Sequence, residues 1–130
     1  GFLRPETAWF WLSCNFWDAH NQRIGLNLAS GVNESFGNEN CLWVNGRLYP
    51  LADVLFEQQS DNQWNIVSLD QSLNLTVTTG WRRYENLNLR LVGSQFSQWQ
   101  ARVSGTIQQD DQEYVLLDEY ALLEQHYAKW

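Results

Sequence analysis

The sequence contains no methionine, only two cysteines and only two prolines. Because translation begins with methionine, we expect this chain of 130 residues, which starts at Gly1, to be a piece of a longer protein. The lack of a signal peptide then says little about its compartment, for which we expect the cytoplasm. Two cysteines cannot make a disulfide framework, so we expect Cys14 and Cys41 to be small buried thiols.

Basic residues and long apolar segments are also scarce. Eight Lys and Arg stand against fifteen Asp and Glu, and the net charge of −7 argues against nucleic acid or an anionic membrane as a partner. No apolar run approaches the roughly 20 residues that span a bilayer. With two histidines and no Cys-x-x-Cys motif, the sequence gives no sign of a zinc site, and we expect neither a metal nor a cofactor. Gly-x-Ser-x-Gly and phosphate-binding glycine motifs are absent as well.

Apolar and aromatic residues, by contrast, are plentiful. Hydrophobic residues make up 44% of the chain and aromatic residues 15%, with eight Trp among them. A chain of this length buries roughly two-thirds of its unfolded surface on folding. The composition therefore predicts one ordered domain with a packed core and excludes a disordered chain.

Hydrophobic alternation with a period of two residues indicates short β-strands, separated by turn signals every ~8–12 residues. The clearest turn is Asn45-Gly46, a dipeptide typical of a two-residue hairpin. Gly105, inside a long strand, predicts a bulge or a close backbone approach. The passage from Trp81 to Tyr84 is expected to be irregular. The predicted strands are 8–16, 23–30, 41–44, 47–51, 54–58, 64–69, 73–79, 87–91, 96–108 and 113–117.

The hairpins follow one another without a crossover helix, which is typical of an all-β, antiparallel, up-and-down barrel of the lipocalin-like (calycin-like) type. A β-sandwich is the alternative. Residues 118–130 fit both helical spacing and strand alternation. We favour a strand paired with the first strand, because that pairing closes the meander, and keep a short C-terminal helix as the alternative.

The first strand, 8–16, carries two different faces. One face is wholly apolar and consists of Phe10, Leu12, Cys14 and Phe16. The other mixes indole rings with small polar side chains and consists of Trp9, Trp11, Ser13, Asn15 and Trp17. We interpret the strand as a wall between a packed core and a partly polar cavity that binds a small apolar or amphipathic ligand. Asn27, on the small-residue face of the second strand, and Asn40 are further candidate ligand-binding residues.

A few acidic and basic side chains could carry chemistry. Glu124 and His126 share a face if 118–130 is a strand, and they could form an acid–base pair or a purely structural hydrogen-bonded pair. Glu39 and Asn40 end the longest polar loop, where they could serve a site at the barrel mouth or satisfy backbone donors. The catalytic candidates are therefore Glu39, Glu124 and His126.

Arg82 and Arg83 lie beside Trp81 and Tyr84 in the sequence. They could bind an anionic group with a guanidinium stacked on a ring. In a chain with a net charge of −7, we expect them instead to pair with Asp or Glu.

Several stretches together resemble a known bacterial family, namely "RIGLNLASGV", "NENCLWVNGRLYPL", "QWNI" and the terminal "EQHYAKW". The chain resembles, over nearly its whole length, the C-terminal part of the domain-of-unknown-function family number 2804. The stretch "GWRRYE" at Gly80–Glu85 departs from the family pattern. The positions that match it are Gly25, Leu26, Asn27, Gly31, Glu39, Asn40, Gly46, Arg47, Glu124 and Trp130.

The resemblance implies a calycin-like barrel and supplies no established activity. Members of the family are about twice this long, which implies that the chain is the C-terminal half of a longer protein. The family is also distantly similar to two-domain lipocalin-like proteins that include carotenoid hydratases and tocopherol cyclases.

Three hypotheses about function follow. The first is a module that binds a small apolar or amphipathic ligand or packs on a second domain, and the partner expected is the N-terminal half of the same protein. The second, by analogy of fold, is an enzyme that acts on a lipid or isoprenoid by acid–base chemistry. The third is a carbohydrate-binding β-sandwich in which exposed Trp rings stack on sugars. We also expect the isolated chain to expose apolar surface and to self-associate.

Overall fold

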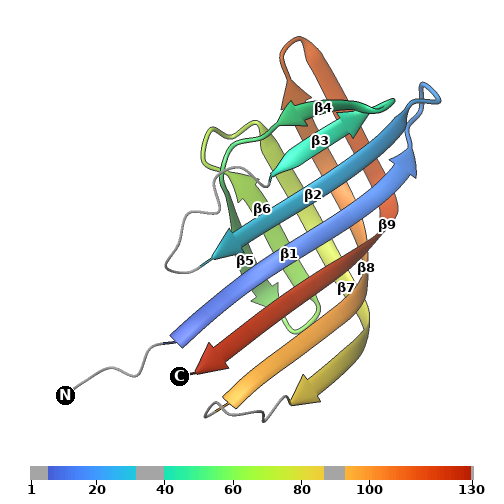
Figure 1. Ribbon diagram of the computed structural model, residues 1–130. Coiled ribbons are helices and arrows are strands. Elements are labelled where there is room, and N and C mark those ends of the chain that lie inside the picture. Colours follow the sequence, from blue (N-terminus) through green and yellow to red (C-terminus); the bar gives the residue numbers. More distant parts are fainter. Residues whose placement is uncertain (1–5, 32–39, 87–92, 130) are drawn as a thin grey trace.

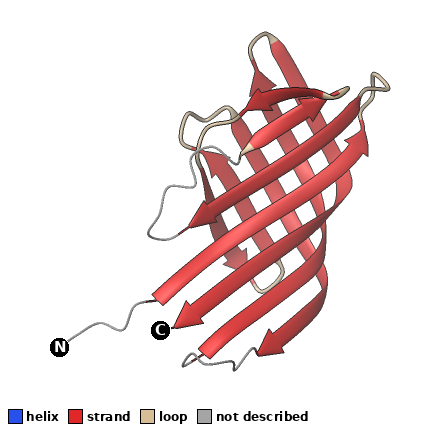
Figure 2. Cartoon of the chain, viewed as in Figure 1, coloured by secondary structure: helices blue, strands red, loops and turns tan. Residues whose placement is uncertain are grey.

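The computed structural model describes residues 6–31, 40–86 and 93–129, and these residues form nine β-strands and no helix (Figures 1 and 2). The alternative of a short C-terminal helix is therefore wrong, because residues 112–129 form one continuous strand. The strands are β1 (Glu6–Trp17), β2 (Arg23–Gly31), β3 (Cys41–Val44), β4 (Arg47–Pro50), β5 (Val54–Ser60), β6 (Gln63–Ser68), β7 (Leu73–Asn86), β8 (Gly93–Gln109) and β9 (Gln112–Lys129).

All nine strands belong to one antiparallel sheet, in the order β4-β3-β2-β1-β9-β8-β7-β6-β5. Neighbours along the chain are neighbours in the sheet, except that β9 pairs with β1 and that β4 and β5 are the two edges. The sheet curls into a half-barrel, so that β5 and β6 lie behind β1 and β2 (Figure 1). The predicted all-β, lipocalin-like meander and its pairing of last strand with first are confirmed.

Two local predictions are confirmed, and a third holds only in part. Asn45 and Gly46 have φ values of 51° and 87°, as a two-residue hairpin requires. Gly105 lies at a bulge between β8 and β9 with φ 146°, and a Cβ added there would lie 2.2 Å from the carbonyl oxygen of Asn74. The stretch 81–84 belongs to β7, and the predicted irregularity is limited to its first residue, because the register shift lies between Thr79 and Arg82 and includes Trp81. The strand predicted at 87–91 lies outside the described residues.

The core fills the concave side of the curled sheet, and every strand from β1 to β9 except β4 contributes fully or nearly buried side chains to it. Burying each such large apolar side chain contributes about 1.5–3 kcal/mol relative to leaving it in water. The largest fully buried side chains are Leu12, Ile24, Leu26, Leu28, Leu42, Ile66, Leu73, Leu75, Val77, Ile107, Leu116 and Leu123.

The orientation of β1 corrects the sequence prediction. Leu12 is opposite Leu28 on β2 and Leu123 on β9, so the apolar face of β1 is continuous with the buried faces of its neighbours. The face with Trp9 and Trp17 therefore lies on the convex, outer side of the sheet and does not line an enclosed interior. The physical reason is that burying that face would cost the hydration of its Ser and Asn side chains.

Among the described residues, no helix could cross a membrane.

Candidate functional site

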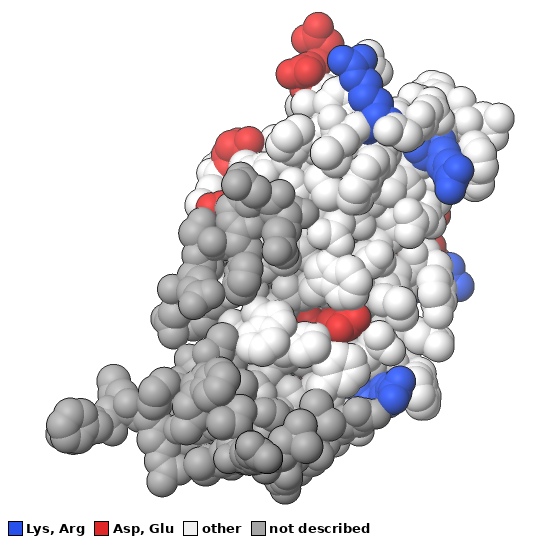
Figure 3. Space-filling model, viewed as in Figure 1, with Lys and Arg blue, Asp and Glu red and all other residues white. Residues whose placement is uncertain are grey.

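The five predicted side chains of β1 remain together on one face, but on the outer surface. Trp9, Trp11 and Ser13 are half-buried, Asn15 is exposed, and 63% of Trp17 is exposed. Figure 3 shows that the described surface over β1, β2 and β9 is largely uncharged, with Lys and Arg mostly toward its ends. Whether this face binds a ligand stays a prediction.

Asn27 joins this outer face, whereas Asn40 does not. The indole Nε1 of Trp11 donates a hydrogen bond to the Asn27 side-chain oxygen across the β1–β2 pair. Asn40 is buried, and its side chain accepts from the Ala29 amide at 2.7 Å and donates to the Ala52 carbonyl at 3.2 Å. Since these bonds tie the start of β3 to β2 and to the β4–β5 connection, we give Asn40 a structural role. Glu39 lies outside the described residues.

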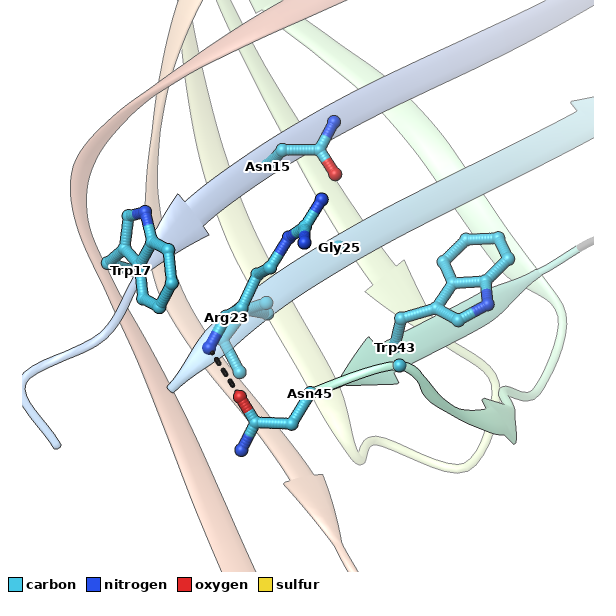
Figure 4. Close-up of a pocket in the computed structure, with 8 residues that line it drawn as sticks. Asn15, Trp17, Arg23, Gly25, Trp43 and Asn45 are labelled. Carbon is cyan, nitrogen blue, oxygen red and sulfur yellow. Dashed lines mark hydrogen bonds between the residues drawn. The ribbon is translucent and has the colours of Figure 1, made fainter. Parts of the chain in front are cut away.

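The outer face is hollowed over β1, β2 and β3, and we call this hollow the outer groove (Figure 4). Its volume is about 510 Å³. Gly25 forms its floor, and a Cβ added there would lie 3.0 Å from the side-chain oxygen of Asn15 and 3.5 Å from the Trp43 ring. The groove is lined by Asn15, Trp17, Arg23, Ile24, Gly25, Trp43, Asn45 and Gly46.

Glu124 and His126 share the outer face of β9, as the strand interpretation predicts. The imidazole Nε2 lies 3.0 Å from the Glu124 Oε1, and the Gln98 amide donates to Oε2 at 3.4 Å. The imidazole is stacked on Trp9, with ring centroids 5.0 Å apart, and contacts Phe96 edge to face at 4.8 Å. Packed in this way, the pair orients one imidazole and leaves 30% of the His126 side chain exposed. Its use as an acid–base pair stays a prediction.

A second group of aromatic side chains lies on the inner face, and we call Phe10, Phe56, Trp64 and Trp99 the inner aromatic cluster. Phe10 stacks on Phe56 at 5.5 Å and contacts Trp64 at 5.3 Å, and Trp64 contacts Trp99 at 6.1 Å. These contacts cross the interior from β5 to β8 by way of β1 and β6. Phe10 and Phe56 are only half-buried, so part of each ring is accessible to solvent.

Arg82 completes the inner aromatic cluster on the side of β7. Its guanidinium carbon lies 4.8 Å from the Tyr84 ring centre and 5.6 Å from that of Trp99, and its Nη2 donates to the Ser97 hydroxyl at 3.0 Å. Arg82 thus shows the stacking of a guanidinium on a ring that the sequence left open as the alternative to pairing with Asp or Glu. Among the carboxylates that the structure describes, none lies within ion-pair distance of Arg82, so the expected pairing with Asp or Glu stays a prediction.

The indole Nε1 of Trp64 is the buried side-chain polar atom that lacks a hydrogen-bond partner among the described residues. Only 3% of Trp64 is exposed, so bulk water does not satisfy this donor. Sequence reasoning missed this site. The signal was present in Trp64 and Trp99 at inward positions of their strands, but without the fold nothing placed Trp64 against Trp99, or Trp99 beside Arg82.

The two cysteine thiols and the potential metal ligands give no sign of a further reactive or metal-binding site among the described residues. Burial, together with the nearby charge of Glu119, raises the pKa of the Cys14 thiol to about 12, and burial also raises the pKa of Cys41. Such thiols are poor nucleophiles at neutral pH. The described residues contain no group of three or more His, Cys, Asp or Glu side chains that could hold a metal ion.

Comparison with known proteins gives one structural and one family match. The fold is similar to the crystal structure of a protein from Nitrosomonas europaea named as a candidate AttH, with a TM-score of 0.66 and 10% sequence identity. The alignment covers 96% of this chain and 52% of that one, so the chain spans about half the length of that protein. No curated protein matches. The sequence pattern of the family described as "Domain of unknown function (DUF2804)" matches residues 1–130, and the chain therefore belongs to the DUF2804 family.

Proposed function

We propose that the chain binds a small amphipathic molecule with an acidic group inside the half-barrel, with the apolar part of the molecule against the inner aromatic cluster. The observation that carries the proposal is the unpaired Nε1 of Trp64, a buried donor in an aromatic interior. An unsatisfied buried donor costs about 1–3 kcal/mol. A ligand oxygen placed beside Trp64 would remove that cost.

Arg82 supplies the recognition of charge. Its guanidinium is held over two rings and by one hydrogen bond to Ser97, and a guanidinium has five N–H donors in total. The remaining donors suit two parallel bonds to a carboxylate. Because stacking fixes the plane of the guanidinium, little side-chain entropy is lost when the acid binds.

The apolar part of the ligand would contact the half-buried rings Phe10 and Phe56, which face each other across the interior. These rings expose apolar surface on the inside of a sheet whose remaining inward positions are densely packed. Covering that surface stabilises the complex by about 25 cal/mol per Å² removed from water. An acid with an alkyl chain combines a carboxylate for Arg82 with an apolar part that covers these rings.

The test is titration of the protein with laurate and with methyl laurate, which keeps the chain and loses the charge. Indole ¹H–¹⁵N resonances report binding at each Trp, and Trp64→Phe identifies the resonance of interest. We expect laurate to bind more tightly than the ester and to shift the Trp64 signal. Arg82→Gln should weaken laurate binding about tenfold or more, as loss of a charged hydrogen bond does.

Arg102→Gln is the matched control. Arg102, which is exposed as Arg82 is, also lies over an aromatic ring, but that ring is Tyr120, at 5.6 Å, which does not belong to the inner aromatic cluster. Equal binding of laurate and methyl laurate, or equal effects of the two arginine substitutions, would contradict the proposal.

We also propose that the chain is the C-terminal half of a longer protein and packs on its other half. This is supported by the similar protein from Nitrosomonas europaea, of which the chain covers 52%. Co-expression of residues 1–130 with the preceding segment should yield a stable complex. Recovery of the two segments as separate species would refute this packing.

A further inference from the structure

We propose that the outer groove is a second ligand site, distinct from the half-barrel interior, and that it binds an acidic saccharide whose carboxylate contacts the Arg23 guanidinium and whose rings lie against the indoles of Trp17 and Trp43. This inference concerns a different face of the sheet and does not depend on the proposed interior ligand. It rests on the placement of two indoles, one glycine and one guanidinium on three adjacent strands.

The register of β1, β2 and β3 creates the space. Asn15 is opposite Gly25, and Gly25 is opposite Trp43, while Trp17 is opposite Arg23. Because β1 and β3 both flank β2, their backbones lie about 10 Å apart. Because Gly25 has no side chain, this spacing leaves a hollow between the two indoles, into which the Arg23 side chain extends.

Gly25 keeps this space open at a cost to the strand. Glycine in a strand interior costs about 0.5–1 kcal/mol relative to alanine. Its φ is not in the positive range, so the backbone does not require glycine there. A Cβ there would lie 3.0 Å from the amide oxygen of the exposed Asn15 side chain, so an added methyl group would displace that side chain and take up part of the groove.

The walls of the groove are open to water. Trp17 is 63% exposed and Trp43 is 39% exposed. An open groove leaves the edge of a ligand in solvent, which suits a ring that carries hydroxyl groups around its edge and apolar C–H faces above and below. Indole rings pack on such faces, and the volume of about 510 Å³ is within the range of small-molecule sites.

Arg23 provides the preference for an acid. Its main chain is fixed, because its N–H donates to the Asn45 side-chain oxygen at 2.9 Å and its carbonyl accepts from the Asn45 N–H at 2.8 Å. Its guanidinium extends over β2 toward Asn15, between the two indoles (Figure 4). In the described part of the chain, neither the Arg23 guanidinium nor the Asn15 amide has a side-chain partner.

The guanidinium can therefore bind a carboxylate in two parallel bonds, and the Asn15 amide can bind a neighbouring hydroxyl. The net charge of −7 does not prevent this, because charges beyond about 8 Å are largely screened at physiological ionic strength. Asn45 acts as a positioning residue for Arg23.

The test is an indole ¹H–¹⁵N titration of the protein with trigalacturonate and with its methyl ester, which keeps the rings and removes the charges. We expect trigalacturonate to shift the Trp17 and Trp43 resonances and to leave that of Trp64 unchanged. The ester should bind about tenfold more weakly. Trp17→Ala and Arg23→Gln should each reduce affinity about tenfold, and Gly25→Ala should reduce it by filling the floor.

Matched controls are Trp81→Ala, since Trp81 is 65% exposed on β7, and Arg102→Gln on β8. Both should bind trigalacturonate as the unsubstituted protein does. No shift at Trp17 and Trp43, equal binding of acid and ester, or equal effects of Trp17→Ala and Trp81→Ala would overturn the proposal. Laurate binding is a separate readout, so the interior site and the outer groove can fail independently.

Discussion

The imidazole ring of His126 lies parallel to the indole ring of Trp9, with 5.0 Å between ring centroids and 6° between the planes. The two residues are directly opposite each other on β9 and β1, and Phe96 is opposite His126 on β8. Three rings thus cross the strands where the end of the chain pairs with its beginning. This row of rings stabilises the outer face of the pairing that joins the two halves of the sheet.

We expect Trp9 and His126 to be energetically coupled. Trp9→Ala and His126→Ala should each lower the free energy of unfolding by about 1 kcal/mol, and the double variant should lose about 0.5–1 kcal/mol less than the sum. Urea unfolding of the four proteins measures the coupling. Strict additivity would show that the stacking contributes nothing to stability.

Cys14 should make stability fall at alkaline pH. Its folded pKa of about 12 lies above the reference value of 9.0, so the unfolded state releases its proton first as the pH rises. The protonated Cys14 thiol therefore makes its full contribution to the free energy of unfolding below pH 9.0, and this contribution is lost as the pH rises from 9.0 to about 12. Between pH 8 and pH 10 we expect a loss of about 1 kcal/mol that Cys14→Ala removes.

Cys41→Ala is the control for Cys14, because Cys41 is less buried. Its pKa is also raised by burial, so the variant should remove a smaller part of the alkaline loss. Urea midpoints at the two pH values give the comparison. An identical pH dependence in Cys14→Ala and in the unsubstituted protein would contradict the predicted linkage.

Gly105 should tolerate no side chain, whereas Gly46 should. Both glycines have positive φ, but a Cβ at Gly105 would collide with the Asn74 carbonyl oxygen at 2.2 Å and a Cβ at Gly46 would have nothing within 4 Å. Gly46→Ala should therefore cost only the backbone strain of about 1–2 kcal/mol. Gly105→Ala should cost at least twice as much. Thermal unfolding of both variants measures these two costs. Similar losses of stability would show that the bulge at Gly105 can relax to accept a side chain.

Asp70 should contribute to stability only above acidic pH. Its Oδ1 accepts from the Ser68 hydroxyl at 2.6 Å and from the hydroxyl and amide of Ser72 at 2.6 Å and 3.0 Å, and these bonds lower the pKa of the carboxyl below 3.8. Because the folded pKa is the lower one, stability is lost as the pH falls from 3.8 through the folded pKa.

Asp70→Asn keeps an oxygen that can accept these bonds and removes the titration. We expect urea midpoints between pH 6 and about pH 2.5 to fall less steeply in this variant than in the unsubstituted protein. Asp61→Asn, in an exposed turn, is the control. If the urea midpoints of all three proteins fell equally steeply with pH, the hydrogen bonds of the Asp70 carboxylate would not be the cause of the acid dependence.

Much of the strand arrangement follows from the sequence alone. Alternation predicts β1, β2, β6 and β8 to within a few residues, and Asn45-Gly46 fixes one hairpin. Alternation also places Glu124 with His126, because residues two apart on a strand share a face. It could not show that β7 continues past Thr79, since a bulge changes which residues alternate.

The sequence thus determined which side chains lie together on one face of a strand, because that depends only on the pleat of the backbone. Only the tertiary structure decided which face is inside. The direction of curl places Leu12 toward the core and Trp9 toward solvent, and it brings Phe10 on β1 into contact with Trp64 on β6, strands far apart in the chain. That choice depends on the sum of contacts across the whole sheet, which no single strand encodes.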